Sequence, residues 1–364
     1  MARPRRRTLS TATLAVAALL LLACAPASVD GLRSGPEPDP STSTPEVRAS
    51  EATRTAPGAS FVFGAAGDLG ANAQTTEGLE RLDSSAAEFF LALGDLDYDE
   101  TSSDAAWCDY VKSHLIRKGP DFPFQLVAGN HEADTGSDGR IRRHAACLQD
   151  KLDARGAYAR QYAFTYPAQQ PLAKVVMISP RLTVQGHTYD YRRGTADRKW
   201  LVDQLDGARQ AGIRWVVVGM HYPCLSVGAG HPGCDAGSAV ENLLLRKRVD
   251  LLLTGHNHIY ERSKQIELSA ACPRVRPGRF DAACVSDTGT DDSYAAGAGT
   301  VQVTSGRVGG RYQGVNPGDP DRPWFVTSGG HTTGWTKVKV TSSRLTATYV
   351  NTSGSMHDSF VISR

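Results

Sequence analysis

The chain has 364 residues, 40% of them hydrophobic, and carries a formal net charge of +2 at pH 7. This is enough apolar material for one large domain or two small ones. A net charge this close to zero gives no reason to expect a polyanion as partner, so the function requires no nucleic acid.

The N-terminus is predicted to be a signal peptide over residues 1–23. A basic stretch at Arg3–Arg7 precedes an apolar stretch, Leu14–Ala23, whose ten residues would form a helix of only ~15 Å, about half of a bilayer core. Leu21-Leu22-Ala23-Cys24 resembles a bacterial lipoprotein box, in which Cys24 would carry the lipid. The alternative is ordinary cleavage after Ala25, which also follows the small-x-small rule.

Residues 24–58 are predicted to be a disordered tether, because they are rich in Pro, Ser and Thr and hold almost no large apolar side chains. The remaining residues, 59–364, are predicted to form a catalytic domain. Within it, residues 270–323 are rich in Gly, Asp, Arg and Pro and are expected to form an insertion loop with one strand at 300–304.

Six cysteines remain if Cys24 is lipidated, and six cysteines in an exported protein suggest three disulfides with fifteen possible connectivities. Proximity in the sequence favours two bonds and elimination gives the third: Cys224–Cys234, Cys272–Cys284 and Cys108–Cys147.

Five apolar segments, each predicted to be a strand, end in a polar residue of a type that binds metals, usually after a glycine. They are Phe61–Asp68, Phe89–Asp95, Phe124–Asn130, Trp215–His221 and Val249–His256. Open α/β sheets place their chemistry at the carboxyl ends of the strands. If all five strands belong to one sheet, their oxygen and nitrogen ligands should meet at one edge and bind metal there.

The order of these motifs resembles the calcineurin-like metallophosphoesterases, and specifically their purple acid phosphatase branch. The quoted motifs are Gly67-Asp68-Leu69-Gly70, Gly94-Asp95 with Tyr98, Gly129-Asn130-His131-Glu132, Val218 with His221, and Gly255-His256-Asn257-His258. The wider superfamily usually has Asp-x-His at its first motif, where this chain has Gly70. The purple branch instead has a tyrosine three residues after the second aspartate, where Tyr98 stands.

The resemblance implies an α/β fold, a four-layer αββα sandwich of two mixed β-sheets. The helices and strands expected from periodicity alternate along residues 61–254, and strands follow from residue 337 to 362; we expect these last strands to form the antiparallel half of a second sheet. The segment Ser179-Pro180-Arg181 departs from the family, because relatives commonly have an acidic residue there.

The resemblance also implies two metal ions. One would be bound by Asp68, Tyr98 and His258, the other by Asn130, His221 and His256, with Asp95 bridging them. A phenolate favours Fe(III) at the first site, and the second ion would be divalent Fe, Zn or Mn. A hydroxide held by the metals would attack phosphorus without a covalent enzyme intermediate.

Two further histidines are candidates for catalysis. His131 matches the family's histidine beside the asparagine ligand and would contact phosphate oxygens. His231 follows His221 by ten residues, in the loop that the Cys224–Cys234 disulfide would close, and is proposed as general acid or substrate clamp. The alternative is that His231-Pro232 is an ordinary surface turn.

The sequence thus predicts an exported, metal-dependent phosphoesterase that hydrolyses small phosphomonoesters in the manner of an acid phosphatase. It would be a cell-surface lipoprotein, touching the membrane only through Cys24, or else secreted. A phosphodiesterase or nucleotidase on the same metals is the alternative activity. A surface lipoprotein that binds metal or phosphate without turnover is a third possibility, disfavoured by the complete ligand set. The sequence makes no prediction of oligomeric state.

Overall fold

The computed structural model describes residues 59–133 and 140–364. The predicted signal peptide and tether lie outside the described residues. Within the described ranges, none of the helices combines the length and the apolar character that crossing a bilayer requires.

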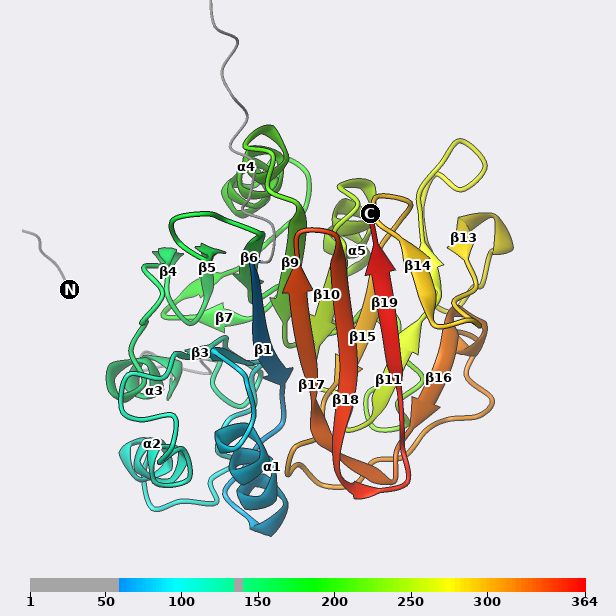
Figure 1. The fold of residues 1–364 in the computed structure, drawn as a ribbon. Helices are drawn as coiled ribbons and strands as arrows, with labels where there is room; N and C mark the ends of the chain where they lie inside the picture. Colours follow the sequence, from blue (N-terminus) through cyan, green and yellow to red (C-terminus); the bar gives the residue numbers. More distant parts are fainter. Residues whose placement is uncertain (1–58, 134–139) are drawn as a thin grey trace, which may run out of the picture. The chain divides into compact units, whose positions relative to one another are not determined.

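The first sheet has seven strands in the order β14-β19-β18-β17-β1-β2-β3 (Figure 1). The strands β1, β2 and β3 are parallel to one another, and β17 pairs antiparallel with β1. Their bounds are β1 Ser60–Ala66, β2 Phe89–Ala92, β3 Phe124–Leu126, β14 Ser293–Ala295, β17 Thr332–Thr341, β18 Arg344–Gly354 and β19 Ser359–Ser363.

The second sheet has eight strands in the order β16-β11-β15-β10-β9-β6-β5-β4. Its centre, β6-β9-β10-β15, is parallel, and β5, β11 and β16 run antiparallel to their neighbours. The bounds are β4 Arg155–Ala157, β5 Gln161–Tyr166, β6 Ala173–Ile178, β9 Trp215–Met220, β10 Leu251–Thr254, β11 Tyr260–Ser263, β15 Val301–Ser305 and β16 Phe325–Gly329. Two small ribbons pair β7 Thr183–Val184 with β8 His187–Thr188 and β12 Gln265–Ile266 with β13 Val285–Asp287.

Alternating side chains build the two faces of each sheet. In β2, Phe89 and Leu91 enter one buried cluster while Phe90 and Ala92 enter another, and β9 divides Trp215 and Val217 from Val216 and Val218 in the same way. The cluster that holds Phe89 and Trp215 contains residues from both sheets. Since successive strand residues point to opposite faces, the two sheets pack face to face around this cluster.

Helices cover the outer faces. They are α1 Ala73–Asp83, α2 Asp104–Ser113 and α3 Arg140–Cys147 beside the first sheet, and α4 Ala196–Gln210 and α5 Ser238–Arg246 beside the second, with two short 3₁₀ turns at Ala282–Cys284 and Arg322–Trp324. Helices α1, α2 and α4 begin where a side-chain oxygen accepts from backbone N–H groups of the first turn: Asn72, Ser103 and Thr195. The predicted four-layer αββα sandwich is confirmed.

Three details differ from or complete the sequence predictions. The motif strands do not share one sheet, because β1–β3 belong to the first and β9–β10 to the second. The last strands, β17–β19, form an antiparallel half as expected, but it belongs to the sheet of β1–β3 and not to a separate one, because β17 pairs directly with β1. All three predicted disulfides are present: Cys108–Cys147, Cys224–Cys234 and Cys272–Cys284.

Candidate metal centre

The carboxyl ends of the parallel strands of both sheets meet at one place. A Cβ added to Gly67, after β1, would lie 3.3 Å from the Cα of Gly255, after β10. His221, after β9, donates its Nδ1–H to the carbonyl of Leu93, which follows β2, over 2.8 Å. The predicted ligands therefore converge although their strands belong to different sheets.

Glycine is needed where the motif loops touch. A Cβ on Gly129 would lie 2.1 Å from Oδ1 of Asp95, and one on Gly255 would lie 2.8 Å from Oδ2 of Asp68. Four of the seven predicted ligands have left-handed backbones: Asp68, Asp95, Tyr98 and His256, with φ of 60°, 51°, 56° and 68°. Such conformations cost about 1–3 kcal/mol each in a non-glycine residue and concentrate at functional sites.

One group of ligand atoms comes from Asp68, Tyr98 and His258. The Tyr98 hydroxyl donates to Oδ1 of Asp68 at 2.7 Å and lies 3.0 Å from Nε2 of His258, which is itself 3.2 Å from the same carboxylate oxygen. Burial, together with the carboxylates of Asp68 and Asp95, raises the pKa of Tyr98. The phenol therefore keeps its proton unless a cation replaces it.

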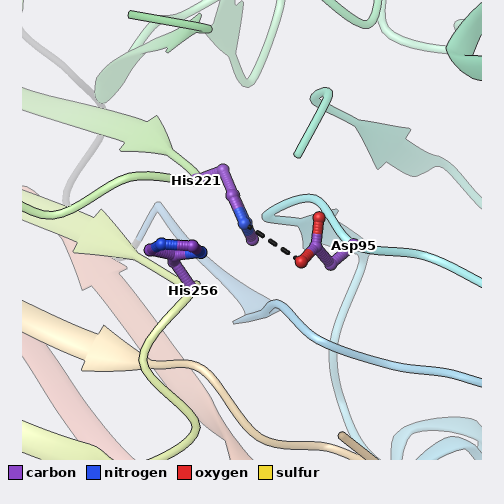
Figure 2. Close-up of side chains that lie close together, drawn as sticks. All are labelled: Asp95, His221 and His256. Carbon is purple, nitrogen blue, oxygen red and sulfur yellow. Dashed lines mark ion pairs between the residues drawn. The ribbon is translucent and has the colours of Figure 1, made fainter. Parts of the chain in front are cut away.

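A second group comes from Asn130, His221 and His256. Nε2 of His221 lies 3.0 Å from Oδ1 of Asn130 and 3.3 Å from Oδ2 of Asp95. Figure 2 shows His221 directed at Asp95, with His256 beside it; one ligand atom from each of these three buried residues lies within 4.8 Å of the others.

Asp95 lies between the two groups. Its Oδ2 is 3.3 Å from the Tyr98 hydroxyl and 3.3 Å from His221. Burial works against ionisation of Asp95, but the charge and hydrogen bond of His221 outweigh it and lower the pKa of the carboxyl. Asp95 is thus the shared neighbour of both groups.

The ring orientations of the three histidines suit metal binding. Nδ1 of His221 faces the carbonyl of Leu93 and Nδ1 of His258 faces that of Arg311. A carbonyl only accepts, so both Nδ1 atoms carry hydrogen, and Nε2 is the nitrogen that faces the carboxylates of the centre. His256 is reversed: its Nε2 lies 3.2 Å from Asp235, and its buried Nδ1 has no hydrogen-bond partner among the described residues. Each imidazole thus turns toward the centre the ring nitrogen that its carbonyl or carboxylate partner leaves free, and a metal ion bound there would displace any proton on it.

The two predicted catalytic histidines contact different members of the ligand set. His131 donates its backbone N–H to Oδ1 of Asp95 at 3.0 Å, and its ring packs edge-on against Tyr98 with centroids 4.6 Å apart. His231 is stacked on His256, with centroids 3.9 Å apart and planes 26° apart. The structure therefore brings all nine predicted site residues into one neighbourhood.

Several residues that the sequence analysis left without a role hold these ligands in place. Glu132 is fully buried and accepts the backbone N–H groups of Asp95, Leu96 and Gly129 at 2.8–3.0 Å. The sequence signal that could have identified Glu132 as a supporting residue was its place in the Gly-Asn-His-Glu motif.

The far end of the predicted insertion also reaches the centre. Gly309 and Gly310 donate to the carbonyl of Asp68 at 3.1 and 2.9 Å, and Gln313 accepts the N–H of His258 at 2.9 Å. No motif marks these residues, so sequence reasoning had no signal for them. Residues 270–323 are therefore more than an insertion loop, because their second half supplies β15 and one wall of the site.

A second group of potential ligands, Asp97, Asp104 and His144, lies nearby but is an ion-pair network. Arg140 binds Asp97 at 2.9 Å and Asp104 at 3.1 Å, and Arg143 also binds Asp104. Burial lowers the pKa of His144 to about 4. Because arginines already neutralise both carboxylates, this network ties α3 to the loop that carries Asp95.

Comparison with known proteins agrees with this arrangement. The chain is 28% identical over 217 residues to purple acid phosphatase 21 of Arabidopsis thaliana and 24% identical over 225 residues to Fe(3+)-Zn(2+) purple acid phosphatase 12 of the same plant. Each match covers 58% of this chain but 47% and 45% of the relative, so the chain spans about half the length of the curated relatives it matches.

Among solved structures, a purple acid phosphatase from yellow lupin (Lupinus luteus) superimposes with a TM-score of 0.61 at 18% identity, covering 84% of this chain and 54% of that one. At this identity the likeness concerns the fold.

The sequence pattern of the family described as calcineurin-like phosphoesterase matches residues 61–260. With its motifs, its two-sheet fold and this match, the chain belongs to the calcineurin-like phosphoesterases and resembles their purple acid phosphatase branch.

Proposed function

We propose that this protein is a phosphoesterase with two metal ions that hydrolyses small phosphomonoesters. The observation that carries the proposal is the convergence of seven oxygen and nitrogen ligands from five strand ends, with each imidazole turning one ring nitrogen toward the centre. Seven ligands are too many for one ion and suit two ions that share a bridging carboxylate.

In this proposal Asp68, Tyr98 and His258 would hold a trivalent iron, and Asn130, His221 and His256 would hold a divalent ion. Asp95, whose Oδ2 lies 3.3 Å from a member of each group, would be the ligand that the two ions share. Such a pair of ions polarises a phosphoryl group and lowers the pKa of a water molecule. The relative named as an Fe(3+)-Zn(2+) enzyme supports this choice of metals.

The protein's own side chains would then orient the substrate and handle its protons. His131 is anchored through its backbone to Asp95 and is 43% exposed, so its ring can donate to a phosphoryl oxygen. His231, which is stacked on His256, would protonate the leaving oxygen as the bond between that oxygen and phosphorus breaks. Asp235 accepts from Nε2 of His256 and so keeps Nδ1 of that ring available as a ligand.

A comparison of two substrates tests the activity. Metal-loaded protein should hydrolyse p-nitrophenyl phosphate faster than bis(p-nitrophenyl) phosphate, and a chelator should abolish the reaction until metal is restored. Asp95→Asn, which removes the bridging charge, should be inactive. Preference for the diester would favour the phosphodiesterase alternative, and hydrolysis of neither would favour a binding protein.

We further propose that the protein is exported and anchored by a lipid on Cys24. The basic and apolar stretches before Cys24 support this proposal. Cys24→Ser should move the protein from the membrane fraction to the medium without changing the activity of the released domain. An unchanged distribution would contradict the anchor.

A further inference from the structure

A cavity of about 710 Å³ opens beside the metal centre. One wall is formed by Pro180, Arg181 and residues 188–192, from the segment after β6 and the β7–β8 ribbon. The other wall is residues 236–240, which lead into α5. The volume is within the range of about 300–1,000 Å³ that is typical of small-molecule sites.

The cavity adjoins the centre through both walls. Asp235, which contacts His256 at 3.2 Å, directly precedes the wall residue Ala236. On the other side, β6 and β9 are parallel and pair Ile178 with Met220, so the segment beginning at Ser179 leaves the sheet beside His221. Consecutive Cα atoms are about 3.8 Å apart, so the cavity begins about one residue away from groups that contact the centre.

Arg181 gives this cavity a positive charge that no carboxylate among the described residues neutralises through an ion pair. It forms no ion pair among the described residues, whereas the other arginine of the cavity, Arg192, is bound by Asp190 at 2.6 Å. The backbone of Arg181 is fixed in a left-handed conformation, φ 62°, by a hydrogen bond from its N–H to the carbonyl of Tyr189 at 2.8 Å. Its side chain extends to the opposite wall, where its Cδ would lie 3.2 Å from a Cβ on Gly237.

The side chain of Arg181 also lies near the groups that contact the metal centre. Gly237, which that side chain approaches, is two residues from Asp235, and Asp235 lies 3.2 Å from Nε2 of His256. A group held at the centre and a group held by Arg181 can therefore belong to one small molecule.

We propose that this cavity receives the leaving group of the phosphoester, and that Arg181 selects leaving groups that carry a second anion, either a carboxylate or a second phosphate. The inference rests on the proposed phosphomonoesterase function and specifies its substrate class. Guanidinium binds both anions with paired, charge-assisted hydrogen bonds, which neutral groups of the same size do not replace.

Three aryl phosphates of similar size separate charge from shape. They are 4-carboxyphenyl phosphate, 1,4-phenylene bisphosphate and the neutral control 4-carbamoylphenyl phosphate. Arg181→Gln should raise KM about tenfold for the anionic compounds, because about a factor of ten corresponds to the loss of one charge-assisted hydrogen bond. The KM of the neutral compound should change by less than about twofold. The kcat values should hold, because Arg181 binds away from the phosphorus. Whichever anionic compound loses more identifies the preferred anion.

Two further variants sharpen the comparison. Arg181→Lys should recover part of the preference, because it restores the charge without the planar fork. Arg192→Gln is the matched control and should leave all three KM values nearly unchanged, since Asp190 already binds that guanidinium. Equal changes for the three compounds in Arg181→Gln, or none, would overturn the inference while leaving the proposed activity intact.

Binding separates the two proposals if turnover is absent. Calorimetric affinities of the same three compounds for metal-loaded protein should show the same roughly tenfold dependence on Arg181. Wild-type protein that binds the anionic compounds in this way but hydrolyses none of them would contradict the proposed activity and support the pocket. If replacing Arg181 leaves the affinities of all three compounds unchanged, the proposal that this cavity selects anionic leaving groups is wrong.

Discussion

The side-chain amide of Asn257 binds both backbone polar groups of His231: its Oδ1 accepts the N–H and its Nδ2 donates to the carbonyl, each at 3.2 Å. Asn257 is fully buried and stands between the two predicted ligands of the Gly-His-x-His motif. The variable position of that motif therefore fixes the loop that stacks the His231 ring on His256.

If His231 protonates the leaving oxygen, His231→Ala should lower kcat about 10²-fold or more for alkyl phosphates, which are poor leaving groups. Activated aryl phosphates need little protonation and should be spared. Rates for the two substrate types, measured over a range of pH, check this, with the exposed His357→Ala as control. A loss of equal size for both types would indicate a role in binding or folding instead.

Asn257→Ala should reproduce part of that defect, because it releases the backbone of His231 without touching the ring. Its effect should depend on His231: in the double variant the loss should be smaller than the product of the single losses, as expected for residues that act as a unit. Near-independent losses would mean that Asn257 acts through the metal ligands beside it. Circular dichroism on each variant controls for unfolding, since a buried amide is removed.

Tyr98 offers a test that does not depend on turnover. A tyrosinate bound to Fe(III) absorbs visible light, so iron-loaded wild-type protein should be violet to pink. Tyr98→Phe keeps the ring that packs on His131 and removes the oxygen, so the band should vanish and the preference for trivalent iron should fall. Visible spectra with metal analysis give the answer. Fully metal-loaded wild-type protein that is colourless and free of iron would exclude Tyr98 as an Fe(III) ligand.

Glu132→Ala should destabilise the fold, because it leaves three buried N–H groups without an acceptor. Each unsatisfied buried group costs about 1–3 kcal/mol, so a total loss of about 3 kcal/mol or more is expected. Denaturant unfolding of the metal-free protein measures this loss, and Glu80→Ala, at an exposed position of α1, is the control. A loss below about 1 kcal/mol would show that water replaces the carboxylate.

Glu241 should make stability fall as pH rises. Burial, with a smaller contribution from the charge of Asp321, raises the pKa of Glu241 to about 7 from 4.5, and neither carboxylate oxygen has a hydrogen-bond partner within the described residues. The folded state thus holds this proton more tightly than the unfolded state. The associated stability is complete below pH 4.5 and is lost as pH rises through about 7.

Glu241→Gln removes that titration and should be more stable than wild type at pH 8, by up to roughly 3 kcal/mol. At pH 4.5 the two proteins should differ little. Thermal or urea unfolding at several pH values provides the measurement, with Glu80→Gln as control for an exposed carboxylate. A wild-type advantage at pH 8 would show that Glu241 has a buried cationic partner there.

Much of this site could be predicted from the sequence because each ligand directly follows an apolar run. Glycine before Asp68, Asp95 and His256 marked the points where a strand ends and a loop must approach another backbone closely. Which sheet each strand would join could not be predicted in this way. Register and neighbours depend on pairings between distant segments, such as β1 with β17, and local periodicity carries no information about them.

The supporting residues show the same limit. Glu132 could be noticed because it stands inside a motif, but its three bonds depend on how two loops meet. Gln313 and Arg181 have no local signature: one holds His258 from 55 residues away, and the other enters a cavity formed by two separate loops. Their roles exist only once β6, β9 and β10 lie side by side.

The pairing of β1 with β17 has a consequence for how the protein is made. Synthesis delivers β1 and Asp68 first, yet β17, one of the two strands that pair with β1, begins at Thr332, and the amides that bind the Asp68 carbonyl are those of Gly309 and Gly310. Segments so far apart in sequence come together slowly. The first ligand to leave the ribosome therefore waits for late segments of the chain, and a nascent or truncated chain that stops before residue 332 carries every predicted metal ligand without β17, the antiparallel neighbour of the strand that leads to Asp68.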